Sequence, residues 1–148
     1  MQREYPDRPI VGVGAIIVDN GRVVLIKRGK APLLGEWSVP GGMLELGETM
    51  RQAAEREALE ETGLEVRTTE LLGVFDRIVS DDAGRHQYHY VLIDFLCEVI
   101  SGKLKAAGDA AEARWFTAEE LSKLLLPKDT AAVTRLGLEK ACEARGKS

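Results

Sequence analysis

The sequence contains little cysteine and no long apolar run. Its two cysteines, Cys97 and Cys142, form no CxxC pair and have no histidine-rich neighbour, so we expect two free thiols and neither a disulfide framework nor a metal or redox site. No apolar run reaches the roughly 20 residues that a membrane-spanning helix needs. The N-terminal stretch MQREYPDRPI also lacks the apolar core of a signal peptide. A soluble, cytoplasmic protein with no membrane partner is therefore expected.

An excess of positive charge is also missing. The formal net charge is -4 and the pI is about 5.3, which argues against a surface for the phosphate backbone, so nucleic acid is not an expected partner. A chain of 148 residues with 45% hydrophobic content can bury one real core but is too short for two ordinary domains. We therefore expect one domain over residues 1–148, without internal repeats or linkers.

Strand-like and helix-like segments alternate along the chain. Two β-branched runs at 10–19 and 22–27 flank Asn20-Gly21, a strong signal for a tight hairpin turn. A loop at 28–36, rich in Gly, Pro and Lys, is long enough to shape a pocket, and Gly41-Gly42 reads as a turn. Further strand-like runs lie at 37–40, 65–67, 71–79, 86–100 and 114–116. This order predicts an α/β protein with a mixed sheet.

Capping signals mark the helices. Thr49 and Gln52 resemble a capping box, and Gly63 stands where a left-handed C-cap would end the helix predicted at 49–62. Thr117 and Glu120 give a second capping box, whose helix we expect to stop at Pro127. A last helix is predicted near 129–145.

Three carboxylates crowd one side of the helix predicted at 49–62. Glu57, Glu60 and Glu61 stand at i, i+3 and i+4 in the stretch REALEETG, so they are neighbours on the helix surface and repel one another. A solvated acidic face is the ordinary interpretation of such a run. Here, however, the same stripe continues backwards through Ala54, Ala53 and Met50, which are apolar. The acids therefore lie on the side that faces inward.

A partly buried acidic cluster needs a compensating charge. Two unit charges about 6 Å apart at an effective dielectric near 20 repel by roughly 3 kcal/mol. Hard divalent cations take oxygen ligands, and Mg²⁺ binds through a few carboxylates while substrate phosphates and water fill its other positions. Mg²⁺, with Mn²⁺ able to substitute, is the expected cofactor.

The spacing of the fixed residues extends well beyond these acids. Gly42, Glu48 and the run from Arg56 to Leu64 fill the pattern G-x5-E-x7-R-E-U-x-E-E-x-G-U, where U is a bulky aliphatic residue. This pattern resembles the Nudix box. Every fixed charged and glycine position is filled, and one position departs, because Ala58 is smaller than the usual aliphatic residue.

The resemblance implies a fold and a reaction. Nudix proteins are α/β/α sandwiches with a mixed central sheet, and they hydrolyse a nucleoside diphosphate linked to another group. By similarity, Glu57, Glu60 and Glu61 are metal ligands, with Gly42 beside the metal, while Glu48 and Arg56 support the acids. The physical argument agrees, because water attack on a pyrophosphate needs charge neutralisation on the phosphoryl oxygens and an activated water.

Residues outside the helix complete the expected site. Glu112, expected in a loop at 105–113, resembles the loop acid that many Nudix enzymes use as a metal ligand or general base, and Asp109 is its competitor. A glutamate of the box, Glu57 or Glu60, is the remaining candidate for the general base. Arg28 is expected to bind a phosphate, with Gly41 and Gly42 also on the substrate. Trp37 either stacks on a base or packs in the sheet core.

The substrate is expected to be a small nucleotide. The layout most resembles the bacterial ADP-ribose pyrophosphatase group, so ADP-ribose or a similar nucleotide sugar is favoured, although no subfamily signature is complete. A nucleoside triphosphate is the alternative, and a sensor that binds a nucleotide without cleaving it is a hypothesis of another class. The family resemblance also makes a homodimer a hypothesis, with the first strands as candidates for its interface.

Overall fold

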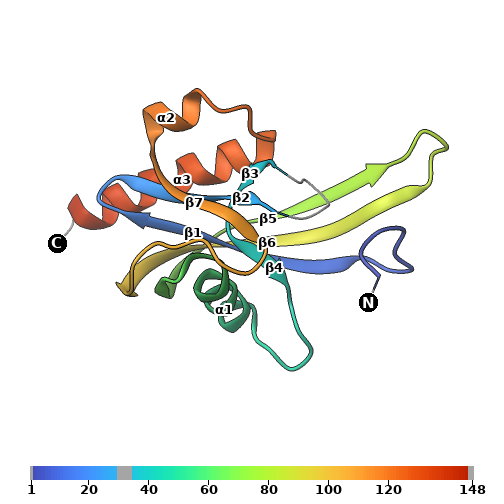
Figure 1. Cartoon of the computed structure of the whole chain (residues 1–148), viewed down its shortest axis with the longest axis horizontal. Coiled ribbons are helices and arrows are strands. Elements are labelled where there is room, and N and C mark those ends of the chain that lie inside the picture. Colours follow the sequence, from blue (N-terminus) through green and yellow to red (C-terminus); the bar gives the residue numbers. More distant parts are fainter. Residues whose placement is uncertain (1, 30–34, 147–148) are drawn as a thin grey trace.

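The computed structural model describes residues 2–29 and 35–146, which form a mixed sheet between helices. The strands are β1 (Ile10–Asp19), β2 (Arg22–Arg28), β3 (Trp37–Ser38), β4 (Gly41–Met43), β5 (Glu65–Ser80), β6 (His86–Ser101) and β7 (Ala110–Thr117). The helices are α1 (Met50–Thr62), α2 (Ala118–Ser122) and α3 (Lys128–Gly146). Figure 1 shows α1 on one side of the strands and α2 and α3 on the other. The expected α/β/α sandwich is confirmed.

Strand β1 lies at the centre of the sheet. It pairs in parallel with β6, from Ile10 opposite Tyr90 to Ile17 opposite Cys97, and antiparallel with β2 and β4. Strand β5 continues the sheet beyond β6, while β3 and β7 both pair with β2. The sheet is therefore mixed, as predicted.

The opening hairpin forms as its turn residues require. Asn20 and Gly21 have φ values of 51° and 72°, the left-handed conformations that a two-residue turn needs at both central positions. Strand β2 runs one residue further than predicted, to Arg28, and its register with β7 shifts between Lys27 and Arg28.

Three strand predictions were wrong in detail. The runs predicted at 65–67 and 71–79 form one continuous strand, β5, whose pairing with β6 absorbs several register shifts. Gly41 and Gly42 belong to β4 and not to a turn, because their backbones pair with Gly14 and Val13 of β1. Strand β7 begins at Ala110, so Glu112 lies in a strand and not in a loop.

The capping predictions for the helices were correct. Thr49 and Gln52 form a complete capping box at α1, and Gly63 ends the helix with a φ of 73°. Thr117 and Glu120 form the second box, but α2 ends at Ser122, well before Pro127. A helix this short is ended by its own tight last turn, in which the Lys123 N–H bonds to Glu120 and Leu121, and the proline is not needed.

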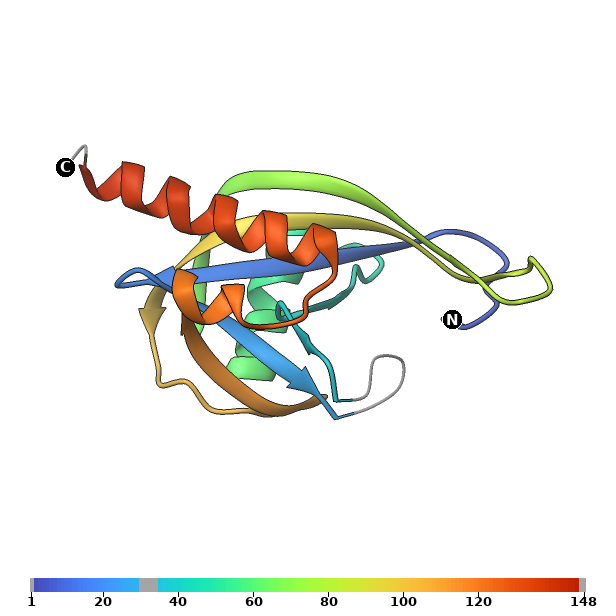
Figure 2. The same ribbon diagram turned by 90° about the horizontal axis from the view of Figure 1, so that it is seen from above.

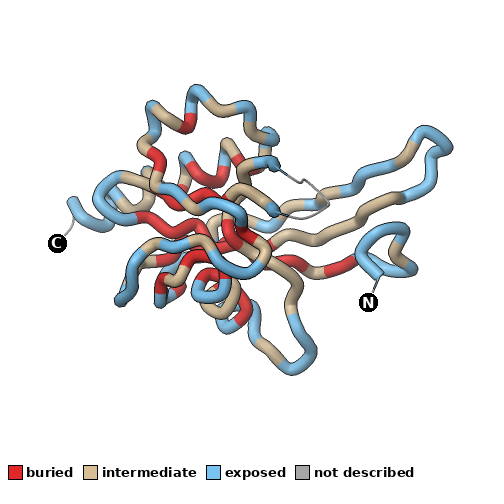
Figure 3. Tube along the Cα trace, viewed as in Figure 1, coloured by how far each residue is buried: buried red, intermediate tan, exposed pale blue. Residues whose placement is uncertain are grey.

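The core lies in two layers, one on each face of the sheet (Figure 3). On the α1 side, Ala53, Ala54 and Ala58 are fully buried against the sheet, so the small residue at the aliphatic position of the box packs without a gap to the solvent. Met50, predicted to face inward, is 44% exposed because it begins the helix beyond the edge of this layer. Residues of α2 and α3, including Leu121 and Val133, cover the other face.

The β5–β6 hairpin extends far beyond the helices, as Figures 1 and 2 show. The N-terminal segment lies against its tip, where the Tyr5 N–H donates to the Gln87 carbonyl at 2.7 Å and the Arg85 guanidinium lies 4.5 Å from the Tyr5 ring. The segment that precedes β1 is thereby held beside the hairpin. Among the described helices, none combines the length and hydropathy needed to cross a membrane.

Helix α3 reaches the sheet through a glycine, which gives the first testable prediction. A Cβ at Gly137 would overlap Cγ2 of the fully buried Ile16. Alanine gains about 1 kcal/mol of helix propensity over glycine, but overpacking a rigid core costs about 1–3 kcal/mol. Because the Cβ would overlap a fully buried side chain, we expect the overpacking cost to exceed the propensity gain, and Gly137→Ala to lower the free energy of unfolding by up to about 2 kcal/mol in urea titrations.

Gly146→Ala is the matched control for this substitution. Gly146 belongs to the same helix, and an added Cβ would have no atom within 4 Å. Its unfolding free energy should stay within about 0.5 kcal/mol of the parent. Equal effects of the two substitutions would contradict the packing argument.

Candidate active site

Helix α1 places two carboxylates directly on the backbone of β4. The Gly41 N–H donates to Oε1 of Glu61 at 2.7 Å. The Glu57 carboxylate lies against Gly42, where a Cβ would overlap it. The missing side chain of Gly42 therefore lets the Glu57 carboxylate from the helix reach the neighbouring strand, whereas a Cβ at Gly41 would instead overlap the Val13 carbonyl of β1. This explains why a glycine stands at the first fixed position of the box.

The guanidinium of Arg56 binds three acids of the box, Glu48, Glu57 and Glu60. Arg56 donates to both carboxylate oxygens of Glu48, at 2.6 and 3.0 Å, in a bidentate pair. The same group donates to Oε1 of Glu57 at 2.8 Å and to Oε2 of Glu60 at 3.3 Å. The hydrogen bond from Arg56 lowers the pKa of Glu48, and Glu48 in turn raises the pKa of Arg56. Arg56 therefore remains charged and fixes the orientation of the acids around it.

The positive charge in this cluster does not balance the negative charge. Burial raises the pKa of Glu61 to about 7, and the neighbouring Glu57 and Asp109 charges add to the effect. Burial also raises the pKa of Glu57, although its bond to Arg56 opposes that rise. Because Glu61 is only 3% exposed, water cannot screen its charge well. Glu57 and Glu61 are therefore desolvated acids within a cluster that carries excess negative charge.

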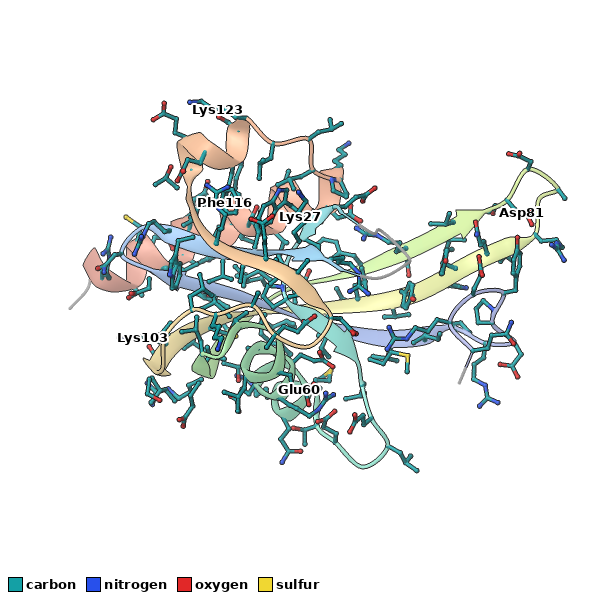
Figure 4. The ribbon with its side chains drawn as sticks, in the orientation of Figure 1. Lys27, Glu60, Asp81, Lys103, Phe116 and Lys123 are labelled. Carbon is teal, nitrogen blue, oxygen red and sulfur yellow. The ribbon has the colours of Figure 1, made fainter. Side chains whose placement is uncertain are left out.

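The oxygen donors of this cluster fit a hard divalent cation. Such an ion takes carboxylate and carbonyl oxygens, and Glu57 and Glu61 present both carboxylates beside the β4 backbone. The Glu60 side chain, labelled on α1 in Figure 4, is 55% exposed and lies 3.3 Å from the Arg56 guanidinium. In residues 2–29 and 35–146, no three acidic, histidine or cysteine side chains stand together as a finished metal cage. The chemistry of the donors fits the cation, while Glu60 lies apart from Glu61.

The segment before β7 carries Asp109 to the same place. The Lys105 N–H donates to the Thr62 carbonyl at 2.8 Å, and the Ala107 N–H donates to the Glu61 carbonyl at 3.2 Å, so this segment pairs with the last carbonyls of α1. On the other side, the Gly29 N–H donates to the Asp109 carbonyl at 2.9 Å. Asp109 is thereby held near enough to raise the pKa of Glu61 by its charge.

Glu112 lies elsewhere. Within β7 it stands opposite Lys27 of β2, and its carboxylate lies 3.7 Å from the Lys27 ammonium. Because side chains alternate along a strand, Glu112 shares a face with Phe116, which packs with α2 and α3. The α1 acids lie on the opposite side of the sheet. The structure therefore brings Asp109, and not Glu112, beside Glu61.

A pocket runs from β4 to the α3 side of the sheet. At one end it is lined by the predicted residues Arg28, Gly41 and Gly42, together with Arg3. At the other end its lining is apolar or aromatic, with Arg77, Asp94 and Asp129 as the charged groups; the apolar residues are Phe75, Tyr90, Leu92 and Val133. The pocket thus has a basic end near Glu57 and Glu61 and a mostly apolar end that contains the carboxylate of Asp94.

Sequence reasoning missed three residues of this pocket. Arg3 precedes the first strand, and Arg77 lies in a strand that pairs far from the box. Asp94 carried the best available signal, because it interrupts the apolar run VLIDFLC of β6. A single charged residue inside an otherwise buried strand indicates either an acid paired within the core or a residue of a functional site.

Trp37 does not line the pocket. Its ring meets Phe116 edge-on at 5.1 Å and lies 5.8 Å from the Lys27 ammonium, within the core layer beneath α2. This placement supports sheet core, the second of the two interpretations. Residues 30–34 of the predicted pocket-shaping loop lie outside the described residues.

Comparisons with known proteins agree with this geometry. A family model described as NUDIX domain matches residues 8–136. An ADP-ribose pyrophosphatase of Methanocaldococcus jannaschii is 42% identical over 116 residues, which are 78% of this chain and 66% of that protein. The chain thus spans slightly less than two thirds of this relative.

Two solved structures show the same architecture. A MutT NUDIX hydrolase from Burkholderia pseudomallei is 33% identical with a TM-score of 0.68, and the match covers 90% of this chain and 98% of that one. A NUDIX hydrolase from Nitrosomonas europaea is 26% identical with a TM-score of 0.73, covering 93% and 74% of the two chains.

The buried Glu61 predicts how stability depends on pH when no divalent cation is present. Its pKa rises on folding to about 7, so the native state binds a proton more tightly than the unfolded state between about pH 4.5 and 7. The free energy of unfolding should therefore fall as pH rises through this window. In Glu61→Gln this fall should be smaller by roughly 2–3 kcal/mol, as measured by urea unfolding with a chelator present.

Glu119→Gln serves as the control, because its side chain is 83% exposed and pairs only at the surface, with Lys123 of the same helical segment. That variant should keep the parent's dependence on pH. If Glu61→Gln also keeps it, Glu61 is not a desolvated acid.

Proposed function

Because the chain belongs to the NUDIX family, we propose that it hydrolyses the pyrophosphate linkage of a nucleoside diphosphate derivative, with ADP-ribose or a similar nucleotide sugar as substrate. One observation carries the proposal. The desolvated carboxylates Glu57 and Glu61 lie on the Gly41–Gly42 backbone beside the basic end of the pocket. A buried negative charge next to arginines at the mouth of a pocket suits a cation that is shared with phosphate groups.

A divalent cation, Mg²⁺ or Mn²⁺, supplies charge neutralisation on the phosphoryl oxygens and lowers the pKa of a water molecule. Glu57 and Glu61 would hold it, with Glu60 able to join by turning away from Arg56. Arg56 fixes Glu57 and Glu48 through its hydrogen bonds, so its role is to position the acids. Arg28 and Arg3 line the pocket and would bind the phosphates of the substrate.

We propose Asp109 as the group that accepts the proton of the attacking water. A general base must lie within reach of the water that it activates, and Asp109 faces Glu61 whereas Glu112 pairs with Lys27 on the other face of the sheet. Of the two acids outside the box that were weighed from the sequence, the geometry favours Asp109; if neither variant loses activity, the base is Glu57 or Glu60 of the box.

Support for the substrate comes from two sources. The archaeal relative, 42% identical, is an ADP-ribose pyrophosphatase. The pocket also has a basic end for phosphates and an apolar end large enough to include two aromatic rings, Phe75 and Tyr90. Association into a homodimer through the first strands stays a prediction.

The first test of this function is a substrate panel with Mg²⁺, with Mn²⁺ and with chelator. We expect ADP-ribose to be cleaved to AMP and ribose 5-phosphate, separated by chromatography, and cleavage to stop on chelation because the acids alone repel phosphate. Glu57→Gln, prepared identically, controls for a contaminating hydrolase and should lose about 10²-fold or more in rate. Preferred cleavage of nucleoside triphosphates would reassign the substrate, and nucleotide binding without any cleavage would indicate a sensor.

The second test compares the two candidate bases. Asp109→Asn should lower kcat by roughly 10²-fold to 10⁴-fold, the usual contribution of a general base, with a smaller change in KM. Glu112→Gln is the matched control and should stay within about twofold of the parent, because it removes only an exposed ion pair. The reverse pattern would restore Glu112 as the base.

A further inference from the structure

Asp94 occupies an unusual position in the middle of β6. Its neighbours across the sheet are glycines on both sides, Gly14 of β1 and Gly73 of β5. A Cβ at Gly14 would overlap Oδ1 of Asp94, and a Cβ at Gly73 would come within 2.7 Å of the Phe75 ring. The two glycines therefore make room for the carboxylate on one side and for an aromatic ring on the other.

The Asp94 carboxylate is buried but receives no hydrogen bond from the described residues. Asp94 is 7% exposed. Arg77, the cation whose charge acts on Asp94, is itself paired with Asp129 of α3 at 3.6 Å. Every fully enclosed side-chain oxygen or nitrogen among the described residues has a hydrogen-bond partner, so the unbonded Asp94 oxygens must reach the surface of the pocket that this residue lines.

Burial raises the pKa of Asp94 to about 6, while Arg77 lowers it and Asp129 raises it. At neutral pH the carboxylate is therefore mostly ionised and lacks a donor. A mostly buried carboxylate that receives no hydrogen bond from the described residues is costly, and a ligand with a hydrogen-bond donor would complete it.

The surroundings of Asp94 indicate the shape of that ligand. Phe75, Leu92 and Val133 line the same end of the pocket and offer flat or apolar surface. Arg28 and the β4 glycines line the other end, near the acids of α1. A ligand whose phosphates lie at the basic end would place its ring system against Phe75 and the edge of that ring toward Asp94.

We propose that Asp94 determines base specificity by accepting a hydrogen bond from the exocyclic amino group of the substrate's adenine-type base. This assignment rests on the proposed function and deepens it. A carboxylate offers only acceptors, so it favours an amino group and repels the keto oxygen that replaces it in a 6-oxopurine. Hydrogen bonds to charged groups contribute about 1.5–3 kcal/mol, which corresponds to a discrimination of roughly 10-fold to 100-fold.

Calorimetric binding of two product-like nucleotides isolates this contact without catalysis. AMP carries the amino group, and purine riboside 5′-monophosphate has hydrogen in its place. The parent protein should bind AMP at least about 10-fold more tightly. In Asp94→Leu the preference should fall to about twofold or less, through weaker binding of AMP and not through tighter binding of the other nucleotide. Asp94→Asn keeps one acceptor and should give an intermediate preference.

Two controls separate the base contact from other roles. Asp76→Asn removes an exposed carboxylate from β5 and should leave the preference unchanged. The ratio of affinities for AMP and 2′-deoxy-AMP should be the same in the parent and in Asp94→Leu. If that ratio collapses while the amino preference persists, Asp94 contacts the sugar and the proposal is overturned.

Equal losses for AMP and purine riboside 5′-monophosphate would show a structural role and would also overturn it. If ADP-ribose is hydrolysed but the amino preference does not depend on residue 94, only the Asp94 assignment fails. If no nucleotide is bound or hydrolysed, the proposed function fails and the assignment fails with it. Urea unfolding of Asp94→Leu and Asp94→Asn identifies a folding defect, and either folded variant decides the question.

Discussion

The close approach of α1 to β4 is the constraint on which the site depends. Three buried alanines bring the helix close to the sheet, and Gly42 places no side chain of its own against the acids of the helix. Only at this separation can the Gly41 N–H reach the Glu61 carboxylate and the Glu57 carboxylate lie over Gly42. A larger residue on either element would move the acids outward, into water that screens their charge. Gly42 of the box and the small Ala58 therefore both keep α1 close to the sheet.

The acidic cluster shows how a protein can hold an unfavourable arrangement in place. Arg56 neutralises part of the charge and fixes the orientation of Glu48 and Glu57, but Glu61 remains buried with a raised pKa. The cost is tolerated because helix caps, the buried alanine face and the Gly41 bond hold the helix regardless. Asp94 repeats this logic at the other end of the pocket, where Gly14 admits a carboxylate to which none of the described residues donates a hydrogen bond. Sites of this kind exchange stability for affinity.

The features that the sequence predicted well are local ones. The Asn20-Gly21 turn and the capping box of Thr49 and Gln52 depend on residues a few positions apart, so their chemistry is visible in the sequence. The errors concern pairing between distant segments. Gly41-Gly42 has the composition of a turn and becomes a strand only because β1 lies beside it, and the face on which Glu112 lies follows from the register of β7 with β2. The position proposed for Asp94 could not be predicted either, because the space for its carboxylate comes from Gly14 on another strand.

The connection from β6 to β7 behaves as a spacer of fixed length. At one end Gly102 turns with a φ of 98° against the Gly63 carbonyl, and further along Lys105 and Ala107 bond to the last carbonyls of α1. Asp109 follows two residues after the last of these bonds. Its distance from Glu61 is therefore set by the hydrogen bonds that tie this connection to α1. An insertion before Lys105 would bulge into solvent and leave the acid in place, whereas one between Ala107 and Asp109 would shift it out of register. Natural variation in loop length should therefore accumulate in the first part of this connection and be excluded from the second.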